Sequence, residues 1–599
     1  MKDLSAVPLD VATLQTGYRS NAFAPVDVIR EIYRRIRALP KNAIWICLRS
    51  EDEAVEAAAA LVAPKNASLF GIPFAVKDNI DVAGLPTTAG CPAFAYRPQD
   101  NASVVQQILE QGGLLIGKTN LDQFATGLVG VRSPYGVCLN LFDSAYVSGG
   151  SSSGSALAVA AGLVSFALGT DTAGSGRVPA AFGNIIGLKP TKGVLSTRGV
   201  VPACRSLDCV SIFSLTAADA ETVFYATAGY DRQDPYSREH RSQLASPKKC
   251  RIGVPKDQQL DEAEAGYRAL FAEAVSRFES LGYSLTTIDA APFLETAKLL
   301  YGGPWVAERF AAVGKFIKEH ADSVHPVVRD IILGGEQYSA IDAFEAQYRL
   351  ETLKKKTEAV WSSIDVLLLP TVPNIYQIKE IEQDPISLNS RLGIFTNFTN
   401  LLDLAAIALP GGFRTDGLPF GITLFAPAFS EPGLLSIASS YLELLRPPLG
   451  ATKMSYPLAD GEKRTERSAP DTILTAVVGA HLTGEPLNYQ LTELGSQFVR
   501  SAKTAPLYRL FALSATEPAK PGLVRVGPER GAAIDLEVWA IPGREFGKFI
   551  RKVSTPLMIG TVHLDDDQQV KGFLCEEIAL SNATDISEFG GWKSYLRSG

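Results

Sequence analysis

The sequence predicts an α/β domain followed by a smaller α+β domain that consists mostly of strands. Segments with helical periodicity, such as residues 26–39 and 267–281, alternate with short apolar runs at residues 114–116 and 366–369. This alternation is typical of layered α/β proteins. The chain of 599 residues is also too long for one hydrophobic core, because cores stop growing near about 250 to 300 residues. We therefore expect two or three domains.

The alternation of helices and strands stops near residue 446. Residues 446–471 are rich in Pro, Gly, Ser and charged side chains, a composition typical of a domain boundary. We predict a first domain at residues 1–446, a linker at 447–471 and a second domain at 472–599. The second domain contains four strand-like segments and one helical segment: residues 477–482, 507–513, 534–541 and 557–564 for the strands, and residues 546–553 for the helix.

Composition and charge exclude several kinds of partner. The net charge is −7, and Lys and Arg are scattered, so the basic stripe of a nucleic-acid-binding protein is missing. The longest apolar run, residues 155–170, is shorter than the roughly 20 residues of a membrane helix. The N-terminus does not resemble a secretory signal, so we expect a cytoplasmic protein. Seven scattered cysteines without a Cys-x-x-Cys pair predict reduced thiols and no metal site.

Three segments rich in small residues are the candidates for a catalytic site. They are GIPFAVKDN at residues 71–79, SGGSSSGS at 148–155 and GTDTAGSGRVP at 169–179. A buried lysine beside serines can replace a Ser-His pair, because a neutral amine can accept a hydroxyl proton. Only five histidines exist, and none lies within about 60 residues of these segments. Each segment alone is more often a solvated linker, and a lone lysine more often lies on the surface, but the apolar run before Lys77 suggests burial.

The sequences GGSSSGSALAVAAG, LGTDTAGSGRVPA, FAVKDNI and GKTNLDQFATG resemble the amidase signature family over roughly residues 14–445. The resemblance implies a mixed central β-sheet covered by helices. It also implies a triad of Lys77, Ser151 and Ser175, in which a cis peptide precedes Ser151. No cofactor and no metal are expected for this chemistry.

Amide hydrolysis requires a strong nucleophile, a base and donors for the oxyanion. In the implied triad, Ser175 is the nucleophile and Lys77 is the base that acts through Ser151. Because a free lysine titrates near 10.4, burial would have to lower the pKa of Lys77 by about 3 units. Ser152 and Arg177 match positions that hold the serines by hydrogen bonds in the family. We assign the oxyanion hole to the backbone N–H groups of Thr172, Ala173, Gly174 and Ser175.

Two further patterns in this region have other readings. Residues 112–119, GGLLIGKT, satisfy the phosphate-loop pattern, but their variable positions have the composition of the strand itself. Residues 150–154 satisfy Gly-x-Ser-x-Gly with Ser152 as the nucleophile of an α/β-hydrolase, but the segment before them is a weak strand. We therefore do not expect either activity.

The substrate is suggested by residues 301–309, YGGPWVAER, together with residues 120–136. These segments resemble the allophanate hydrolases within the family. The resemblance implies that Arg309 and Tyr301 hold the carboxylate and ureido groups of the substrate, with Gly127 also in the pocket. An arginine suits a carboxylate because its planar fork pairs with two oxygens. Without the resemblance, a surface ion pair between Arg309 and Glu308 or another neighbour is the alternative.

The second domain also resembles allophanate hydrolases, at VVGAHLTGEPLNYQL, IDLEVWAIP and VKGFLCEE. The resemblance implies a fold similar to γ-glutamylcyclotransferases, and either decarboxylation of N-carboxycarbamate or a role in assembly. His481 is the candidate residue there, because a histidine can hold or protonate a carboxylate. A lone histidine in an apolar strand is more often a core residue, so both readings stay open.

The expected reaction is hydrolysis of allophanate (urea-1-carboxylate) through N-carboxycarbamate to ammonia and carbon dioxide. A homodimer and an association with urea carboxylase are implied as partners. The alternatives are another amidase signature enzyme, such as a glutamine amidohydrolase, and a second domain that serves only assembly. A non-catalytic relative is disfavoured because all three triad residues are present. Urea and triazine degradation deliver the same substrate, so the pathway stays open.

Overall fold

The computed structural model describes residues 3–61, 67–239, 250–457, 472–514, 516–566 and 568–598. The chain divides into two compact units, Met1–Leu458 and Ala459–Gly599, and each has a large hydrophobic core of its own. Most of the predicted linker, residues 458–471, lies outside the described residues. The described part of that linker packs on the first unit, because the side-chain amide of Asn184 donates to the carbonyls of Pro448 and Gly450.

The first unit is built on one mixed sheet of 11 strands, which confirms the predicted α/β class. Neighbouring strands follow the order β1 (Trp45–Leu48), β3 (Leu114–Thr119), β2 (Pro73–Lys77), β4 (Phe166–Thr170), β6 (Val210–Ser214), β5 (Ile186–Lys189), β10 (Leu404–Phe413), β11 (Pro419–Pro427), β9 (Val366–Pro370), β7 (Arg251–Pro255) and β8 (Ser284–Ile288). Strand β2 runs parallel to both of its neighbours, β3 and β4. The apolar runs predicted as strands at residues 114–116 and 366–369 lie in β3 and β9.

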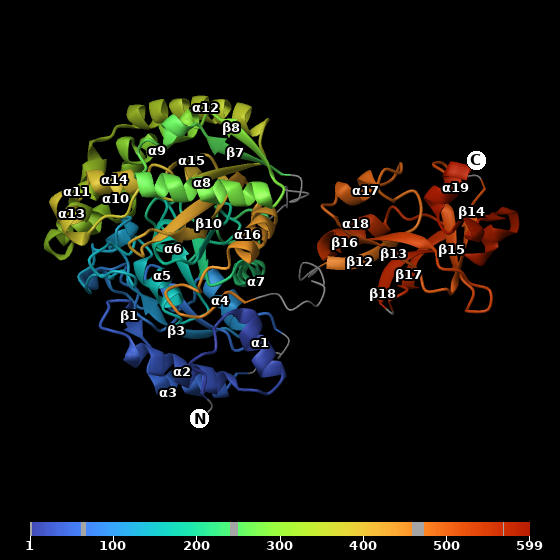
Figure 1. Ribbon diagram of the computed structural model, residues 1–599, viewed down its shortest axis with the longest axis horizontal. Helices are drawn as coiled ribbons and strands as arrows, with labels where there is room; N and C mark the ends of the chain where they lie inside the picture. Colours follow the sequence, from blue (N-terminus) through green and yellow to red (C-terminus); the bar gives the residue numbers. More distant parts are fainter. Residues whose placement is uncertain are drawn as a thin grey trace. The chain divides into compact units, whose positions relative to one another are not determined.

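Helices surround this sheet, and the two segments predicted from helical periodicity are α2 and α8. The helices are α1 (Val11–Arg19), α2 (Pro25–Ala38), α3 (Glu51–Ala59), α4 (Ser103–Glu110), α5 (Ser153–Ala160), α6 (Val178–Phe182), α7 (Ala217–Thr227), α8 (Ala265–Ser280), α9 (Ala291–Gly302), α10 (Trp305–Glu319), α11 (Pro326–Leu333), α12 (Ala340–Trp361), α13 (Ile378–Gln383), α14 (Ser387–Leu392), α15 (Phe398–Leu401) and α16 (Glu431–Leu445). Figure 1 shows α2 and α3 near β1, and α12 at the opposite end near β8.

The segment of residues 155–170 is core, as predicted. It forms the end of α5, a turn at Gly162, where φ is +65°, and strand β4. Every residue of α5 is buried, and its small side chains allow close packing. A Cβ atom on Gly154 would lie 2.4 Å from the carbonyl oxygen of Ile44. A helix that is apolar on all sides is typical of the interior of a large domain.

The second unit has two sheets and three helices in its described part. The larger sheet has the order β13 (Gln497–Lys503), β16 (Asp535–Pro542), β12 (Thr472–Val477), β18 (Gln569–Cys575) and β17 (Leu557–His563), and the smaller has the order β15 (Pro521–Arg525), β14 (Tyr508–Ala512) and β19 (Thr584–Asp585). The helices are α17 (Tyr489–Thr492), α18 (Gly543–Ile550) and α19 (Trp592–Ser598). This β-rich α+β architecture agrees with the predicted class.

One predicted strand of the second unit is wrong. Strand β12 ends at Val477, whereas the sequence predicted a strand at residues 477–482. The chain turns at Gly479 instead, and the N–H of Leu482 donates to the carbonyl of Gly479 at 2.8 Å. His481 therefore lies in a turn and not in an apolar strand. The other predicted strands lie in β14, β16 and β17, and the predicted helix overlaps α18.

The topology brings the three small-residue segments to the carboxyl ends of neighbouring strands in the first sheet. Lys77 is the last residue of β2, and Thr170 is the last residue of β4. Because β2 and β4 are parallel neighbours, their carboxyl ends lie together, which is where α/β proteins commonly bind ligands. No described helix is long and apolar enough to cross a membrane.

Candidate active site

Lys77, Ser151 and Ser175 form one continuous hydrogen-bonded chain. The Nζ of Lys77 donates to the Oγ of Ser151 at 2.7 Å, and the two serine Oγ atoms lie 3.0 Å apart. The peptide bond between Gly150 and Ser151 is cis. Lys77 and Ser151 are fully buried, whereas Ser175 is 3% exposed. The three residues that the sequence singled out therefore meet, and Ser175 is the least buried of them.

The environment of Lys77 favours a neutral amine. Its Nζ also donates to the Oγ1 of Thr170 at 2.7 Å, and no described carboxylate lies within ion-pair distance of it. Burial lowers the pKa of Lys77 to about 7, although the negative charges of Asp122, Asp208 and Asp171 act in the opposite direction. An amine with this pKa is partly neutral near pH 7 and can accept a proton.

Residues 172–175 lie in the loop between β4 and α6. The side-chain amide of Asn400 donates to the carbonyls of Asp171 and Thr172 at 2.7 and 3.1 Å. Among the described residues, no acceptor lies within hydrogen-bond distance of the backbone N–H groups of residues 172–175. Unpaired N–H groups beside a serine hydroxyl are suited to an anionic oxygen.

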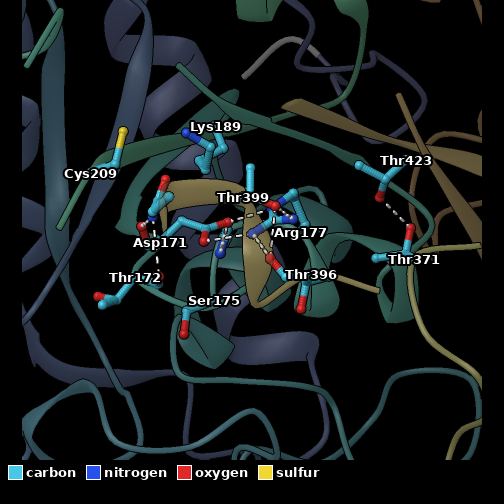
Figure 2. Close-up of polar contacts among 12 residues, drawn as sticks. Asp171, Thr172, Ser175, Arg177, Lys189, Cys209, Thr371, Thr396, Thr399 and Thr423 are labelled. Atoms are coloured by element: carbon cyan, nitrogen blue, oxygen red, sulfur yellow. Dashed lines mark hydrogen bonds and ion pairs between the residues drawn. The ribbon is translucent and has the colours of Figure 1, made fainter. Parts of the chain in front are cut away.

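A buried ion pair holds this segment in place. The guanidinium of Arg177 contacts the Asp171 carboxylate through Nε at 2.8 Å and through Nη2 at 3.0 Å. Figure 2 shows the Arg177 side chain among Asp171, Thr396 and Thr399. The same carboxylate accepts the N–H of Gly176 at 3.1 Å. The Asp171 and Arg177 pair thus holds the backbone next to Ser175, and Asp171 is a residue of this cluster that the sequence reasoning did not single out.

Ser152 has a positioning role and does not point to the reacting atoms. Its Oγ donates to the carbonyl of Thr170 at 3.1 Å and lies 3.3 Å from the N–H of the same residue. This pair of contacts joins the start of α5 to the end of β4. The segment of residues 112–119 is the buried strand β3 with the turn before it, so the lysine of the phosphate-loop pattern, Lys118, lies inside the sheet.

Two more carboxylates shape the site, and neither was predicted. Asp122 accepts the N–H groups of Val129, Gly130 and Arg132 at 3.0 to 3.2 Å, so it organises the loop that follows β3. Asp208 accepts the Oγ1 hydroxyl of Thr172 at 2.5 Å. Asp122 lies within the matched GKTNLDQFATG segment, where it could have been found, but no motif surrounds Asp208.

Arg309 and Tyr301 lie together, because Tyr301 is in the last turn of α9 and Arg309 is near the start of α10. The Nη2 of Arg309 donates to the hydroxyl of Tyr301 at 3.3 Å, and its Nη1 donates to the Oγ1 of Thr126 at 3.0 Å. Gly127 follows Thr126, and a Cβ atom there would meet the Asp122 carboxylate at 2.5 Å. The positive charge of Arg309 contributes to lowering the pKa of Lys77.

Arg309 has no acidic partner among the described residues. It is 3% exposed, and the alternative ion pair with Glu308 is not formed. Glu308 instead accepts the N–H of Ser206 at 2.6 Å. A buried cation without a carboxylate is costly unless a ligand supplies one. A carboxylate on a ligand would supply the counter-charge that Arg309 lacks in direct contact.

His481 is in the second unit and is not part of this cluster. Its ring stacks on Phe573 with the centroids 4.9 Å apart and meets the edge of Phe549 at 5.4 Å. The Nε2 atom lies 3.2 Å from the Oε1 of Gln490. Burial lowers the pKa of His481 to about 4, so the ring is neutral at physiological pH. It can donate or accept a hydrogen bond there, but it does not carry a positive charge.

Two family profiles match the chain. The profile described as Amidase matches residues 27–435, and the profile described as Allophanate hydrolase C-terminal domain matches residues 473–597. The first covers the unit that holds the Lys77, Ser151 and Ser175 cluster, and the second covers the unit that holds His481.

Proteins similar to the whole chain and to its first unit are known. The urea amidolyase of Saccharomyces cerevisiae is 43% identical over 96% of this chain, which spans 32% of the yeast protein. The chain thus has about a third of the length of the urea amidolyases it matches. A glutamyl-tRNA(Gln) amidotransferase subunit from Methanosarcina acetivorans is 34% identical over 68% of this chain and 91% of its own length.

A solved structure extends the similarity to both units. The allophanate hydrolase of Kluyveromyces lactis superposes with a TM-score of 0.78 and 41% identity, and the match covers 98% of this chain and 99% of that one.

Proposed function

The chain belongs to the amidase family, and from this premise we propose that it hydrolyses allophanate. The observation that carries the proposal is the buried Arg309, which forms no ion pair among the described residues and contacts Tyr301 and Thr126 in the unit that holds Lys77, Ser151 and Ser175. Such a site favours a small amide that bears a carboxylate. The similarity to an allophanate hydrolase over both units supports the same substrate.

In the proposed first step, the Oγ of Ser175 attacks the terminal carbamoyl carbon of allophanate. The Ser175 proton moves to Ser151 while the Ser151 proton moves to the neutral amine of Lys77, which the 3.0 and 2.7 Å contacts allow. The carbonyl oxygen becomes negative and is held by the N–H groups of residues 172–175. The C–N bond then breaks, and the proton returns along the same chain so that ammonia leaves.

In the second step, water attacks the Ser175 ester and the same relay removes its proton. The released acid is N-carboxycarbamate, which decomposes to carbon dioxide and ammonia. Throughout both steps Arg309 and Tyr301 hold the substrate carboxylate, because a planar guanidinium can donate two parallel hydrogen bonds to it. The carboxylate is not a reacting group, and its binding energy is used to orient the carbonyl carbon over Ser175.

The test is ammonia release from allophanate, with urea, biuret, malonamate and glutamine as comparators. We expect selective turnover of allophanate by the unaltered chain, no turnover by Ser175→Ala, and full turnover by the control Ser280→Ala, which changes an exposed serine. Turnover that survives Ser175→Ala would remove the nucleophile from this proposal. Turnover of glutamine alone would instead favour a glutamine amidohydrolase, the alternative that the similarity to the amidotransferase supports.

The second unit has two candidate roles, decarboxylation of N-carboxycarbamate or assembly of a cytoplasmic homodimer that cooperates with urea carboxylase. The match to urea amidolyases supports an association with urea carboxylase. Because each unit has its own core, the chain can be cut within residues 458–471. Accumulation of N-carboxycarbamate after the cut favours catalysis by the second unit. Loss of the dimer with unchanged ammonia release favours assembly.

A further inference from the structure

Residues 203–208 join the helix that carries Arg309 to the segment beside Ser175, and we call these residues the spacer. At one end, the Glu308 carboxylate accepts the N–H and the Oγ hydroxyl of Ser206, both at 2.6 Å. It also accepts the thiol of Cys204 at 3.0 Å. Glu308 directly precedes Arg309 in the first turn of α10. The spacer is therefore tied to α10 at the turn that positions the guanidinium.

At its other end, the spacer is tied to the segment of residues 172–175. The Asp208 carboxylate accepts the N–H groups of Ala203 and Cys204 at 2.9 and 3.1 Å, which closes the spacer into a compact turn. The same carboxylate accepts the Oγ1 hydroxyl of Thr172 at 2.5 Å. Cys204 is fully buried and contacts both carboxylates. One turn thus links the arginine site to the N–H groups beside Ser175.

Cys204 and Leu207 of the spacer pack in the core of the first unit, whereas its outer side borders a cavity. A cavity of about 280 Å³ lies there, and its lining includes Pro202, Arg205 and Asp208. Arg205 and Ser206 are exposed. A segment that borders a cavity lacks the van der Waals contacts that would otherwise fix it. On this side the hydrogen bonds of Glu308 and Asp208 add to the core packing in positioning the spacer.

We propose that the spacer sets the distance between Arg309 and the N–H groups of residues 172–175, and so selects substrates by length. Glu308 and Asp208 are positioning residues in this reading and do not touch the substrate. The inference rests on the proposed function in taking Arg309 as the carboxylate site. The selected substrate has one atom between its carboxylate carbon and its scissile carbonyl carbon, as in allophanate and malonamate. Succinamate, with two such atoms, is too long.

The test measures hydrolysis of malonamate, succinamate and the neutral amide propionamide by the unaltered chain and by Glu308→Gln. Because a small misplacement of a bound group can cost about 100-fold in rate, we expect the preference for malonamate over succinamate to fall at least about 10-fold in the variant. The loss should reside mainly in KM for malonamate, while turnover of propionamide changes little, because that substrate does not engage Arg309. A uniform loss for all three substrates would overturn the proposal.

Two further variants make the test independent of folding. Ser206→Ala changes an exposed residue and removes one of the three contacts to Glu308, so it should shift the preference in the same direction by a smaller factor. Glu319→Gln, at the exposed end of the same helix, is the matched control and should leave the preference unchanged. The proposal is also overturned if the unaltered chain hydrolyses malonamate and succinamate equally, or if it hydrolyses neither of them. If the unaltered chain prefers malonamate over succinamate but does not hydrolyse allophanate, only the proposed substrate is overturned.

Discussion

The amine of Lys77 lies 2.7 Å from the hydroxyl of Ser151 and has no ion-pair partner in the described chain. The pKa of Lys77 is raised from a distance by the charges of Asp122, Asp171 and Asp208, but burial lowers it by more. A carboxylate in direct contact would hold the amine protonated and prevent it from accepting a proton. The absence of such a contact suits Lys77 to the proposed role of base, and two measurable consequences follow from it.

The first consequence is a pH dependence of activity. Because the pKa of Lys77 is about 7, the fraction of neutral amine falls about tenfold per pH unit below that value. We expect kcat/KM for malonamate, whose carboxyl group titrates at much lower pH, to fall with that slope below pH 7 and to level off above it. A profile that inflects near pH 10, as for an exposed lysine, would contradict the assignment of Lys77 as the base.

The second consequence concerns stability. Folding lowers the pKa of Lys77 from 10.5 to about 7, so between these values the unfolded chain binds the extra proton and stability rises with pH. Below pH 7 the buried charge costs on the order of 5 kcal/mol, and above 10.5 that cost disappears. Lys77→Met should therefore stabilise the inactive protein at pH 6 and much less at pH 9. Chemical denaturation at both pH values measures the difference, and equal effects would contradict the shift.

Arg309 provides a prediction about substrate charge. Removing its guanidinium in Arg309→Gln should raise KM for malonamate about 10- to 100-fold, because charge-assisted hydrogen bonds contribute about 1.5 to 3 kcal/mol each. Turnover of propionamide, which lacks a carboxylate, should change little. Steady-state kinetics with both substrates tests this. The control Arg329→Gln removes a guanidinium that is 32% exposed on α11, and it should affect neither substrate.

Local sequence patterns were sufficient to predict the helices and strands that the sequence analysis named in the first unit. Residues 26–39 and 114–116 were assigned correctly, because their apolar spacing reflects one buried helix face and one buried strand. Lys77, Ser151 and Ser175 could be named because the segments that contain them resemble the motifs of the amidase signature family. Their meeting depends on β2 and β4 being parallel neighbours, which no local pattern encodes.

The residues that were not found act through tertiary contacts. Asp208 is 36 residues from Thr172 in the chain, and nothing around it differs from an ordinary loop. His481 was placed in a strand because residues 477–482 are mostly apolar, but Gly479 faces the Pro521 ring, where a Cβ atom would lie 2.2 Å from Cδ. The chain turns there because of that close approach. Such contacts exist only after the fold forms, so sequence periodicity does not reveal them.

Gly174 provides a test of the N–H groups beside Ser175. Its φ is +151°, and a Cβ atom would lie 2.4 Å from the Oγ1 of Thr396. Gly174→Ala should displace the segment, and because loss of one oxyanion donor costs about 100- to 1000-fold, kcat should fall by roughly that factor. KM should change less. The control Gly266→Ala, in α8, adds a methyl group where no atom lies within 4 Å. Unchanged kcat in Gly174→Ala would remove these N–H groups from the mechanism.

The buried pair of Asp171 and Arg177 provides the last prediction. Arg177→Met leaves a buried carboxylate without its cation and should lower the free energy of unfolding by about 3 to 5 kcal/mol. Asp171→Asn combined with Arg177→Met should recover part of that loss, because neither charge then remains buried alone. The exposed pair of Arg268 and Asp261 is the control, and Arg268→Ala should cost less than about 1 kcal/mol.

Activity separates the structural role of this pair from its role at the site. The double variant of Asp171 and Arg177 should recover stability but not kcat, because Asp171 also accepts the N–H of Gly176 beside the nucleophile and Arg177 fixes the carbonyl of Thr396. Denaturant titrations give the stability, and ammonia release from malonamate gives kcat. If kcat recovers together with stability, the ion pair serves only folding, and the position of Ser175 must be set by other contacts, such as those of Asn400 to the carbonyls of Asp171 and Thr172.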